Sequence, residues 1–160
     1  MYEILLAEKL NGSVMKMVIS APLVAKKCLA GQFIILRVDE VGERIPLTIF
    51  DYDRKSGTVS IIFQIVGATT RKLSLLKKGD YLFDFVGPLG NPTNTNDINK
   101  VLVIGGGVGT AIAFPICKEL YESKKEVDAI VGFRNKELVI LEDDFRDVTK
   151  QFFIMTDDGS

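Results

Sequence analysis

The sequence contains no histidine, and its two cysteines, Cys28 and Cys117, lie far apart. These scarcities exclude a histidine-based catalytic triad, a zinc site made of cysteine and histidine, and an iron–sulfur cluster bound only by cysteines of this chain. We therefore predict no metal site within these residues. Isolated cysteines are typical of a reducing compartment, so a cytoplasmic location is expected.

Long apolar runs and an excess of one charge are also missing. The 20 Lys and Arg residues nearly balance the 21 Asp and Glu residues and are mixed with them, which indicates no nucleic-acid partner. The longest uncharged run, residues 101–117, contains four glycines and a proline. It falls short of the roughly 20 apolar residues that span a membrane, so no membrane span is expected. The N-terminus lacks the pattern of a signal peptide.

The first part of the chain has the pattern of a small antiparallel β-barrel. Short runs of β-branched and aromatic residues alternate with turn residues, and they cover residues 2–10, 13–20, 32–39, 44–51, 58–66 and 81–87. One helical segment, 69–80, interrupts them. Six short strands in this arrangement predict an antiparallel six-stranded barrel.

The pattern changes after residues 87–100, a stretch rich in Gly, Pro, Asn and Thr. Beyond it, strands are expected at 101–105, 127–133 and 151–156, with a helix near 108–123 and a mixed segment over 135–149 between them. Such alternation predicts a parallel sheet with helical crossovers. The predicted domains are residues 1–97, a β-barrel, and residues 98–160, a partial α/β nucleotide-binding domain.

A glycine-rich turn follows the first strand of the α/β part. The strict dinucleotide pattern G-x-G-x-x-G is not met, because Thr110 and Ile112 stand where its last glycine would be. The second strand ends at Arg134 instead of the acid that commonly holds a ribose. Three glycines before a helix, at 106, 107 and 109, still permit close backbone approach and leave N–H groups for a phosphate. A tight turn without a ligand is the alternative.

Two stretches of the barrel half carry candidate ligands for a phosphate. Arg44 and Thr48 lie four residues apart on one expected strand, so their side chains share a face. An arginine can bind a phosphate bidentately, although an exposed pair on an edge strand with Pro46 is the simpler reading. The turn from Gly67 to Thr70 starts a helix and offers free N–H groups, although an ordinary helix cap would have the same residues.

The order of these segments resembles the ferredoxin–NADP reductase superfamily, in which a flavin-binding antiparallel barrel precedes a pyridine-nucleotide domain. The segments are "GERIPLTI", "IFQIVGATTRKL", "KKGDYLFDFVGPLGNP", "VLVIGGGVG", "GFRNKELVILEDDF" and "MTDDGS". Within the superfamily, the chain resembles the small flavin subunit of NADH-dependent ferredoxin–NADP oxidoreductase, also called the sulfide dehydrogenase β subunit. The electron-transfer subunit of bacterial dihydroorotate dehydrogenase is a near relative.

The resemblance implies that the barrel binds FAD. Arg44 would contact the pyrophosphate, and Thr48 would approach the flavin N5 as the catalytic residue. Pro46 and Leu47 would lie along the isoalloxazine, with Leu47 where the superfamily often has an aromatic residue, and Ile45 would be a further flavin contact. The remaining implied flavin contacts are Phe63 and Gln64 beside the ring, and Gly67, Ala68, Thr69 and Thr70 at the pyrophosphate.

The resemblance also implies a second ligand, NAD(P)H. Its expected contacts are Gly106, Gly107, Val108, Gly109 and Arg134. The chain would then be part of an NAD(P)H-dependent flavoprotein oxidoreductase that moves electrons between NAD(P)H, FAD and an iron–sulfur partner. Alternatives are an electron-transfer subunit of dihydroorotate dehydrogenase, and a non-catalytic module that kept the fold without the cofactor.

Partners follow from the same resemblance. We expect either ferredoxin or a larger subunit with flavin and iron–sulfur centres. The cysteines for a [2Fe–2S] cluster are expected only in a C-terminal region that relatives have and this sequence lacks. A sheet ending at residues 151–156 would leave an apolar edge, so a homodimer through the C-terminal half is also expected.

Overall fold

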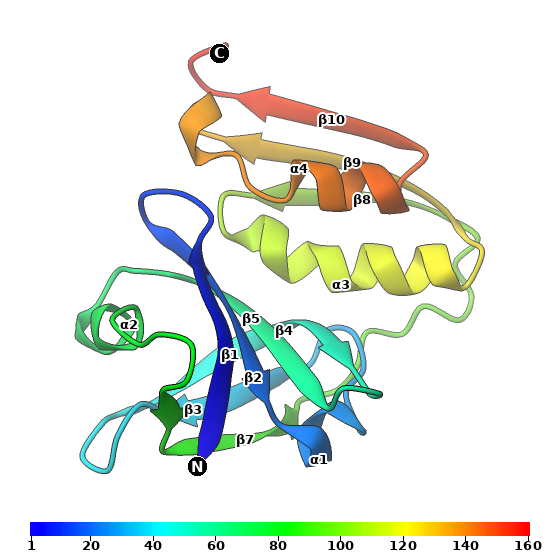
Figure 1. The fold of residues 1–160 in the computed structure, drawn as a ribbon. Helices are drawn as coiled ribbons and strands as arrows, with labels where there is room; N and C mark the ends of the chain where they lie inside the picture. The colour runs from blue at the N-terminus through cyan, green and yellow to red at the C-terminus, as the bar shows by residue number, and fades with distance from the viewer. The chain divides into compact units, whose positions relative to one another are not determined.

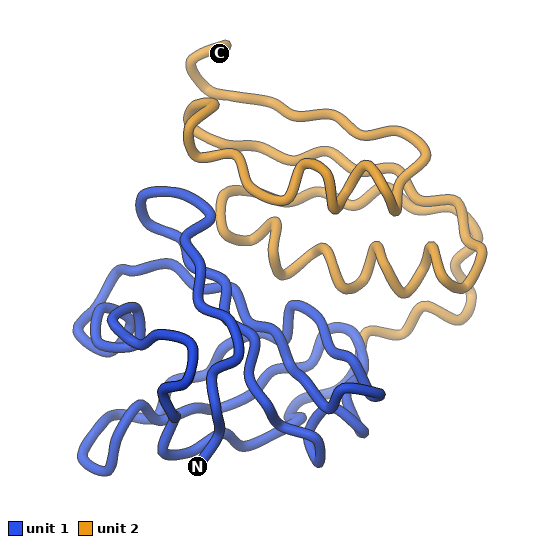
Figure 2. Tube along the Cα trace, viewed as in Figure 1, with its two compact units in different colours: residues 1–92 blue, residues 93–160 orange.

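The computed structural model covers residues 1–160, which form two compact units, residues 1–92 and residues 93–160 (Figure 2). The boundary predicted between residues 97 and 98 falls within the second unit. No helix is both long enough and apolar enough to cross a membrane.

The first unit is one antiparallel sheet of seven strands in the order β6-β1-β2-β5-β4-β3-β7, curled into a nearly closed barrel (Figure 1). Two short helices, α1 (Pro22–Ala25) and α2 (Ala68–Leu73), interrupt the strands. The strands are β1 (Tyr2–Lys9), β2 (Val14–Ser20), β3 (Phe33–Arg37), β4 (Arg44–Asp53), β5 (Thr58–Gln64), β6 (Tyr81–Leu82) and β7 (Asp84–Leu89).

The antiparallel barrel is confirmed, but the predicted number of six strands is wrong. The run predicted as one strand over 81–87 divides at Phe83, whose backbone N–H points at the carbonyls of Arg37 and Val38, 3.1 and 3.3 Å away. Before this residue β6 pairs with β1, and after it β7 pairs with β3. One stretch of chain therefore supplies both ends of the sheet. Helix α2 is also shorter than predicted and ends at Leu73.

The barrel interior is filled by alternate residues of its strands, as the period of a β-strand requires. Each fully buried aliphatic or aromatic side chain stabilises the fold by about 1.5–3 kcal/mol. The fully buried side chains of this core include Ile4, Met17, Ile19, Ile34, Leu36, Ile49, Ile61, Phe63, Leu73, Leu82 and Phe85.

The second unit has the predicted strand–helix alternation. Its parallel sheet has the order β10-β9-β8 and consists of β8 (Lys100–Gly106), β9 (Glu126–Phe133) and β10 (Gln151–Thr156). The connections contain α3 (Gly109–Glu122), a single 3-10 turn (Lys136–Leu138) and α4 (Glu142–Val148). The small parallel sheet with helical crossovers is thus confirmed.

Both helices of the second unit pack on the same face of its sheet. Phe145 of α4 lies between Phe114 of α3 and Phe152 of β10, with ring centroids 5.3 and 5.4 Å away. Strand β9 alternates strictly, so that every second residue is buried against the helices. This aromatic cluster fixes α4 against α3 and the edge strand.

The opposite face of this sheet is apolar and exposed. Ile104, Ile130 and Phe153 form one row across the three strands, and Leu102 and Met155 flank it. Ile104 is 71% exposed and Phe153 51%. Parallel sheets usually carry cover on both faces, so this surface is unusual for the sheet type. The homodimer expected through this half stays a prediction.

Candidate functional site

Strands β4 and β5 are hydrogen-bonded along only part of their length, and an opening separates them beyond it. The two strands pair from Asp53 and Thr58 as far as Ile49 and Ile61, and their pairing stops there. Strand β4 continues to Arg44 paired with β3, and β5 continues to Gln64 paired with β2. Backbone groups of residues 44–48 and 62–64 that face the opening therefore have no ladder partner across it, which leaves them available to a ligand.

Strand β4 presents the predicted flavin residues on two different faces. Arg44 and Pro46 are exposed and Thr48 is half-buried, and the three alternate along the outer face. Ile45 and Leu47 point the other way and pack against the barrel core. The outer face thus combines a guanidinium, a rigid apolar ring and a hydroxyl that makes no hydrogen bond within the protein.

Strand β5 separates its two predicted residues in the same way. Phe63 is 2% exposed and belongs to the barrel core, whereas Gln64 is exposed at the end of the strand. The side chains of Ile45, Leu47 and Phe63 all pack on the barrel core. Phe63 is fully buried, so only its backbone is open to a ligand, whereas Ile45 and Leu47 are half-buried.

The turn before α2 is held by its own side chains. The Thr70 hydroxyl accepts hydrogen bonds from the backbone N–H groups of Val66 and Gly67, at 3.0 and 2.9 Å. The N–H groups of Ala68 and Thr69, in the first turn of the helix, have no intrahelical acceptor. A Cβ at Gly67 would meet no atom within 4 Å, so the approach to this turn is open.

Two side-chain contacts tie α2 to the loop that leads into β4. Thr69 Oγ1 donates to Glu43 Oε2 at 3.1 Å, and Lys72 forms an ion pair with Asp39. Lys72 also holds the pKa of the Asp39 carboxyl below its usual value, chiefly through their hydrogen bond. The structure thereby brings the predicted turn next to the start of β4, where Arg44 stands.

The glycine turn of the second unit has the geometry that close backbone approach requires. Gly107 has φ +51°, in the left-handed region, and its N–H donates to the Gly132 carbonyl at 2.8 Å. A Cβ at Gly106, Gly107 or Gly109 would meet no atom within 4 Å. The outer side of the turn is therefore open to a ligand.

Helix α3 begins directly after this turn. The N–H groups of Thr110 and Ala111 already donate to the carbonyls of Gly107 and Val108. Those of Val108 and Gly109 have no acceptor, so the positive end of the helix dipole carries two free donors. The Thr110 hydroxyl is buried beside Gly105 without a hydrogen-bond partner.

The loops after β9 and β10 meet at the same edge of the sheet. Arg134 is exposed, and its carbonyl accepts a hydrogen bond from the Asp158 N–H at 3.3 Å. Ser160 donates from its hydroxyl to Asp158, and this bond lowers the pKa of the Asp158 carboxyl. The Ser160 hydroxyl also accepts from the Lys136 N–H at 2.9 Å. Ligands of open α/β sheets bind at this carboxyl edge of the strands.

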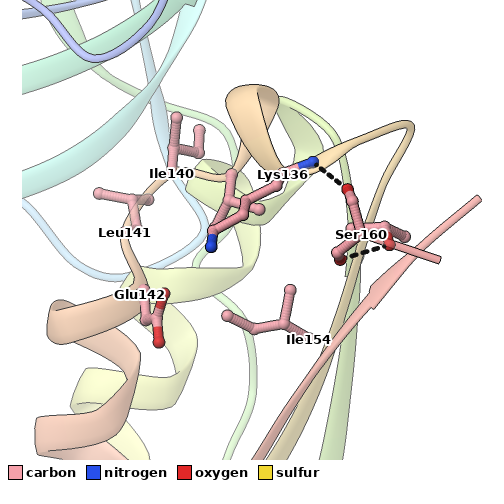
Figure 3. A pocket seen from close by; sticks show the side chains of 8 residues that line it. Lys136, Ile140, Leu141, Glu142, Ile154 and Ser160 are labelled. Carbon is pink, nitrogen blue, oxygen red and sulfur yellow. Dashed lines mark hydrogen bonds between the residues drawn. The ribbon is translucent and has the colours of Figure 1, made fainter. Parts of the chain in front are cut away.

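A pocket of about 430 Å³ lies at this edge, and the sequence did not predict it (Figure 3). Leu141, the N-cap residue of α4, lines this pocket. Its φ of +62° lies in the left-handed region, which is strained for a residue with a bulky side chain. Residues just after parallel strands are the only sequence feature that points here. The lining residues are Lys136, Val139, Ile140, Leu141, Glu142, Ile154, Thr156 and Ser160.

Neither cysteine belongs to a reactive site. Burial raises the pKa of the Cys28 thiol to about 11, although Arg54 opposes the shift, and burial raises that of Cys117 to about 12. Both side chains are fully buried. Because the thiolate is the reactive form, these residues act as core side chains.

Known proteins with this fold and this order of segments are numerous, although no protein-family model matches the chain. The dihydroorotate dehydrogenase B (NAD(+)) electron-transfer subunit homologue of Thermotoga maritima is 40% identical over 158 residues, which is 99% of this chain and 56% of that protein. The corresponding subunit of Streptococcus pneumoniae is 39% identical over 136 residues, 82% of this chain and 52% of its own length. The chain thus spans about half the length of the curated relatives it matches.

Comparison with solved structures finds the same kind of relative as comparison of sequences. A chain of the NADH-dependent reduced ferredoxin–NADP oxidoreductase is 40% identical and superposes with a TM-score of 0.91, covering all of this chain and 58% of that one. The ferredoxin reductase of carbazole 1,9a-dioxygenase, at 21% identity, has a TM-score of 0.84 and shows the fold alone.

The protein therefore has the ferredoxin reductase-like fold. It is homologous to the electron-transfer subunits of dihydroorotate dehydrogenase B and to the NADH-dependent ferredoxin–NADP oxidoreductase, and the predicted resemblance is confirmed.

Proposed function

We propose that the chain is the flavin-binding part of an NAD(P)H-dependent electron-transfer oxidoreductase. FAD would bind to the barrel, and the second unit would receive the pyridine nucleotide. The observation that carries the proposal is the opening between β4 and β5, beside an outer face with Arg44, Pro46 and Thr48. The relatives named above are electron-transfer subunits, which supports the same class of function.

The residues of the opening suit FAD. The guanidinium of Arg44 would bind the pyrophosphate through a charge-assisted hydrogen bond, and the open turn from Gly67 to Thr70 would add backbone donors. Pro46 offers a flat apolar surface for the ring, and the unpaired Thr48 hydroxyl would reach N5. When bound, FAD supplies the redox chemistry, accepting a hydride and releasing electrons singly, so no protein acid or base is required.

The second unit would hold the nucleotide through its backbone and one cation. Gly106, Gly107, Val108 and Gly109 would line the pyrophosphate, with the two free N–H groups directed at it. Arg134 stands at the end of β9, where it would contact the adenosine ribose or its phosphate. The electron acceptor would be an iron–sulfur protein such as ferredoxin or a larger partner subunit.

Titration with FAD tests the proposal directly. We expect the purified chain to quench flavin fluorescence and to develop the 300–600 nm spectrum of a bound flavin. A chain that binds neither FAD nor riboflavin would be a module that kept the fold without the cofactor.

Thr48→Val is expected to leave FAD bound and change its reactivity. The substitution nearly preserves volume and removes the hydroxyl that would face N5, a neutral hydrogen bond worth about 1 kcal/mol. The reduction potential and the rate of photoreduction should shift modestly, while the dissociation constant stays near that of the wild type. Thr58→Val, on β5 at the far end of the β4–β5 ladder, serves as the control. An unchanged potential in Thr48→Val would show that Thr48 does not face N5.

A further inference from the structure

Three charged side chains form a row across neighbouring strands of the barrel. Arg37 of β3 is the register partner of Arg44 on β4 and of Asp84 on β7. Residues directly opposite each other on adjacent strands point to the same face, so all three share one face. Two arginines side by side repel each other, and the carboxylate at the end of the row offsets that repulsion.

The two arginines are engaged differently. Arg37 donates from Nη1 to the Glu40 carbonyl at 3.0 Å, and its guanidinium lies 4.4 Å from the centre of the Phe83 ring. The Arg44 side chain makes one hydrogen bond, from Nη2 to Asp84 Oδ2 at 3.2 Å. Asp84 therefore bonds to Arg44 and not to its direct neighbour Arg37, whose guanidinium is already engaged by Glu40 and Phe83.

The contact leaves most of the Arg44 guanidinium unused. A guanidinium carries five N–H donors in a planar fork, and Asp84 occupies one Nη2 donor. The Nε and Nη1 donors remain for a phosphate. Arg44 is a long, exposed side chain with about 2 kcal/mol of rotamer entropy, so a fixed contact at its tip reduces the ordering that ligand binding must supply.

We propose that Asp84 is a positioning residue for Arg44, which it holds in the orientation that binds the FAD pyrophosphate. This inference rests on the proposed flavin function. Asp84 acts through its hydrogen-bond acceptor and not through its negative charge, because the charge by itself repels a phosphate. The amide oxygen of asparagine at this position can accept the same hydrogen bond.

FAD titrations of Asp84→Ala and Asp84→Asn test the proposal. A hydrogen bond contributes about 1 kcal/mol net, so the alanine variant should bind FAD about fivefold more weakly. The asparagine variant should stay within about twofold of the wild type, and both should bind riboflavin, which has no phosphate, with unchanged affinity. Equal or tighter FAD binding by Asp84→Ala would overturn the proposal and make the carboxylate a repulsive group.

A double-mutant cycle separates positioning from a structural role. Asp84→Ala should cause no further loss of FAD affinity once Arg44 is alanine, because Asp84 acts only through Arg44. Additive losses, or a loss of riboflavin affinity, would mean that the substitution damages the barrel, and would overturn the proposal. A wild-type chain that does not bind FAD would refute the proposed function as well, whereas normal binding by Asp84→Ala beside weak binding by Arg44→Ala refutes only this inference.

Discussion

Arg44→Ala is expected to weaken FAD binding by about ten- to a hundredfold. The substitution removes a charge-assisted hydrogen bond to phosphate, worth about 1.5–3 kcal/mol. Arg44 is exposed on the outer face of β4, and its side chain makes a single hydrogen bond, to Asp84. Its loss should therefore leave the barrel core intact. Fluorescence titration gives the dissociation constants.

The choice of ligand makes this experiment specific. Because Arg44 would contact only the pyrophosphate, Arg44→Ala should bind riboflavin as the wild type does. Arg44→Lys keeps the charge but loses the planar guanidinium, so its affinity for FAD should fall between that of the wild type and that of Arg44→Ala. Lys55→Ala removes one exposed positive charge from the turn between β4 and β5 and should change nothing. Wild-type affinity for FAD in Arg44→Ala would remove Arg44 from the site.

The strands could be predicted because their periodicity is local. Alternation of apolar and polar residues along β4 and β9 follows directly from the geometry of a strand, and helix α3 begins after glycines as expected. The division of residues 81–87 into β6 and β7 was not predictable in this way. It depends on Phe83 meeting the carbonyls of Arg37 and Val38, which are distant in sequence.

The candidate site was predictable in its residue types but not in its orientations. Arg44 and Thr48 share a face because they are four residues apart, and that much follows from the sequence. The same rule places Leu47 on the inner face, where it packs on the core. The contact between Arg44 and Asp84 requires the register of three strands, and the pocket near Leu141 requires the loops after β9 and β10 to converge. No pattern of neighbouring residues in the sequence predicts either the contact or the pocket.

The glycine turn of the second unit allows its structural and ligand-binding roles to be separated by two neighbouring substitutions. A Cβ at Gly105 would lie 2.9 Å from the Thr110 Cα and 3.2 Å from its Oγ1, so strand β8 and helix α3 would have to separate. Such overpacking costs about 1–3 kcal/mol. A Cβ at Gly106 would meet no atom within 4 Å, and Gly106 does not have a positive φ.

Gly105→Ala is therefore expected to destabilise the second unit, and Gly106→Ala to leave its stability unchanged or raise it by about 0.4–1 kcal/mol. Amide hydrogen exchange in β8 and α3 measures this difference within the unit, without assuming that both units unfold together.

For NADH binding, the substitution that matters is the one on the open side of the turn, Gly106→Ala. The methyl group of Gly106→Ala would stand where the dinucleotide pyrophosphate approaches, and should weaken NADH binding on the order of tenfold, or about 1.4 kcal/mol. If Gly106→Ala binds NADH as the wild type does while its exchange is unchanged, the turn is a close contact between β8 and α3 with no ligand of its own. If it loses affinity with its fold intact, the open side of the turn is the surface that the nucleotide uses.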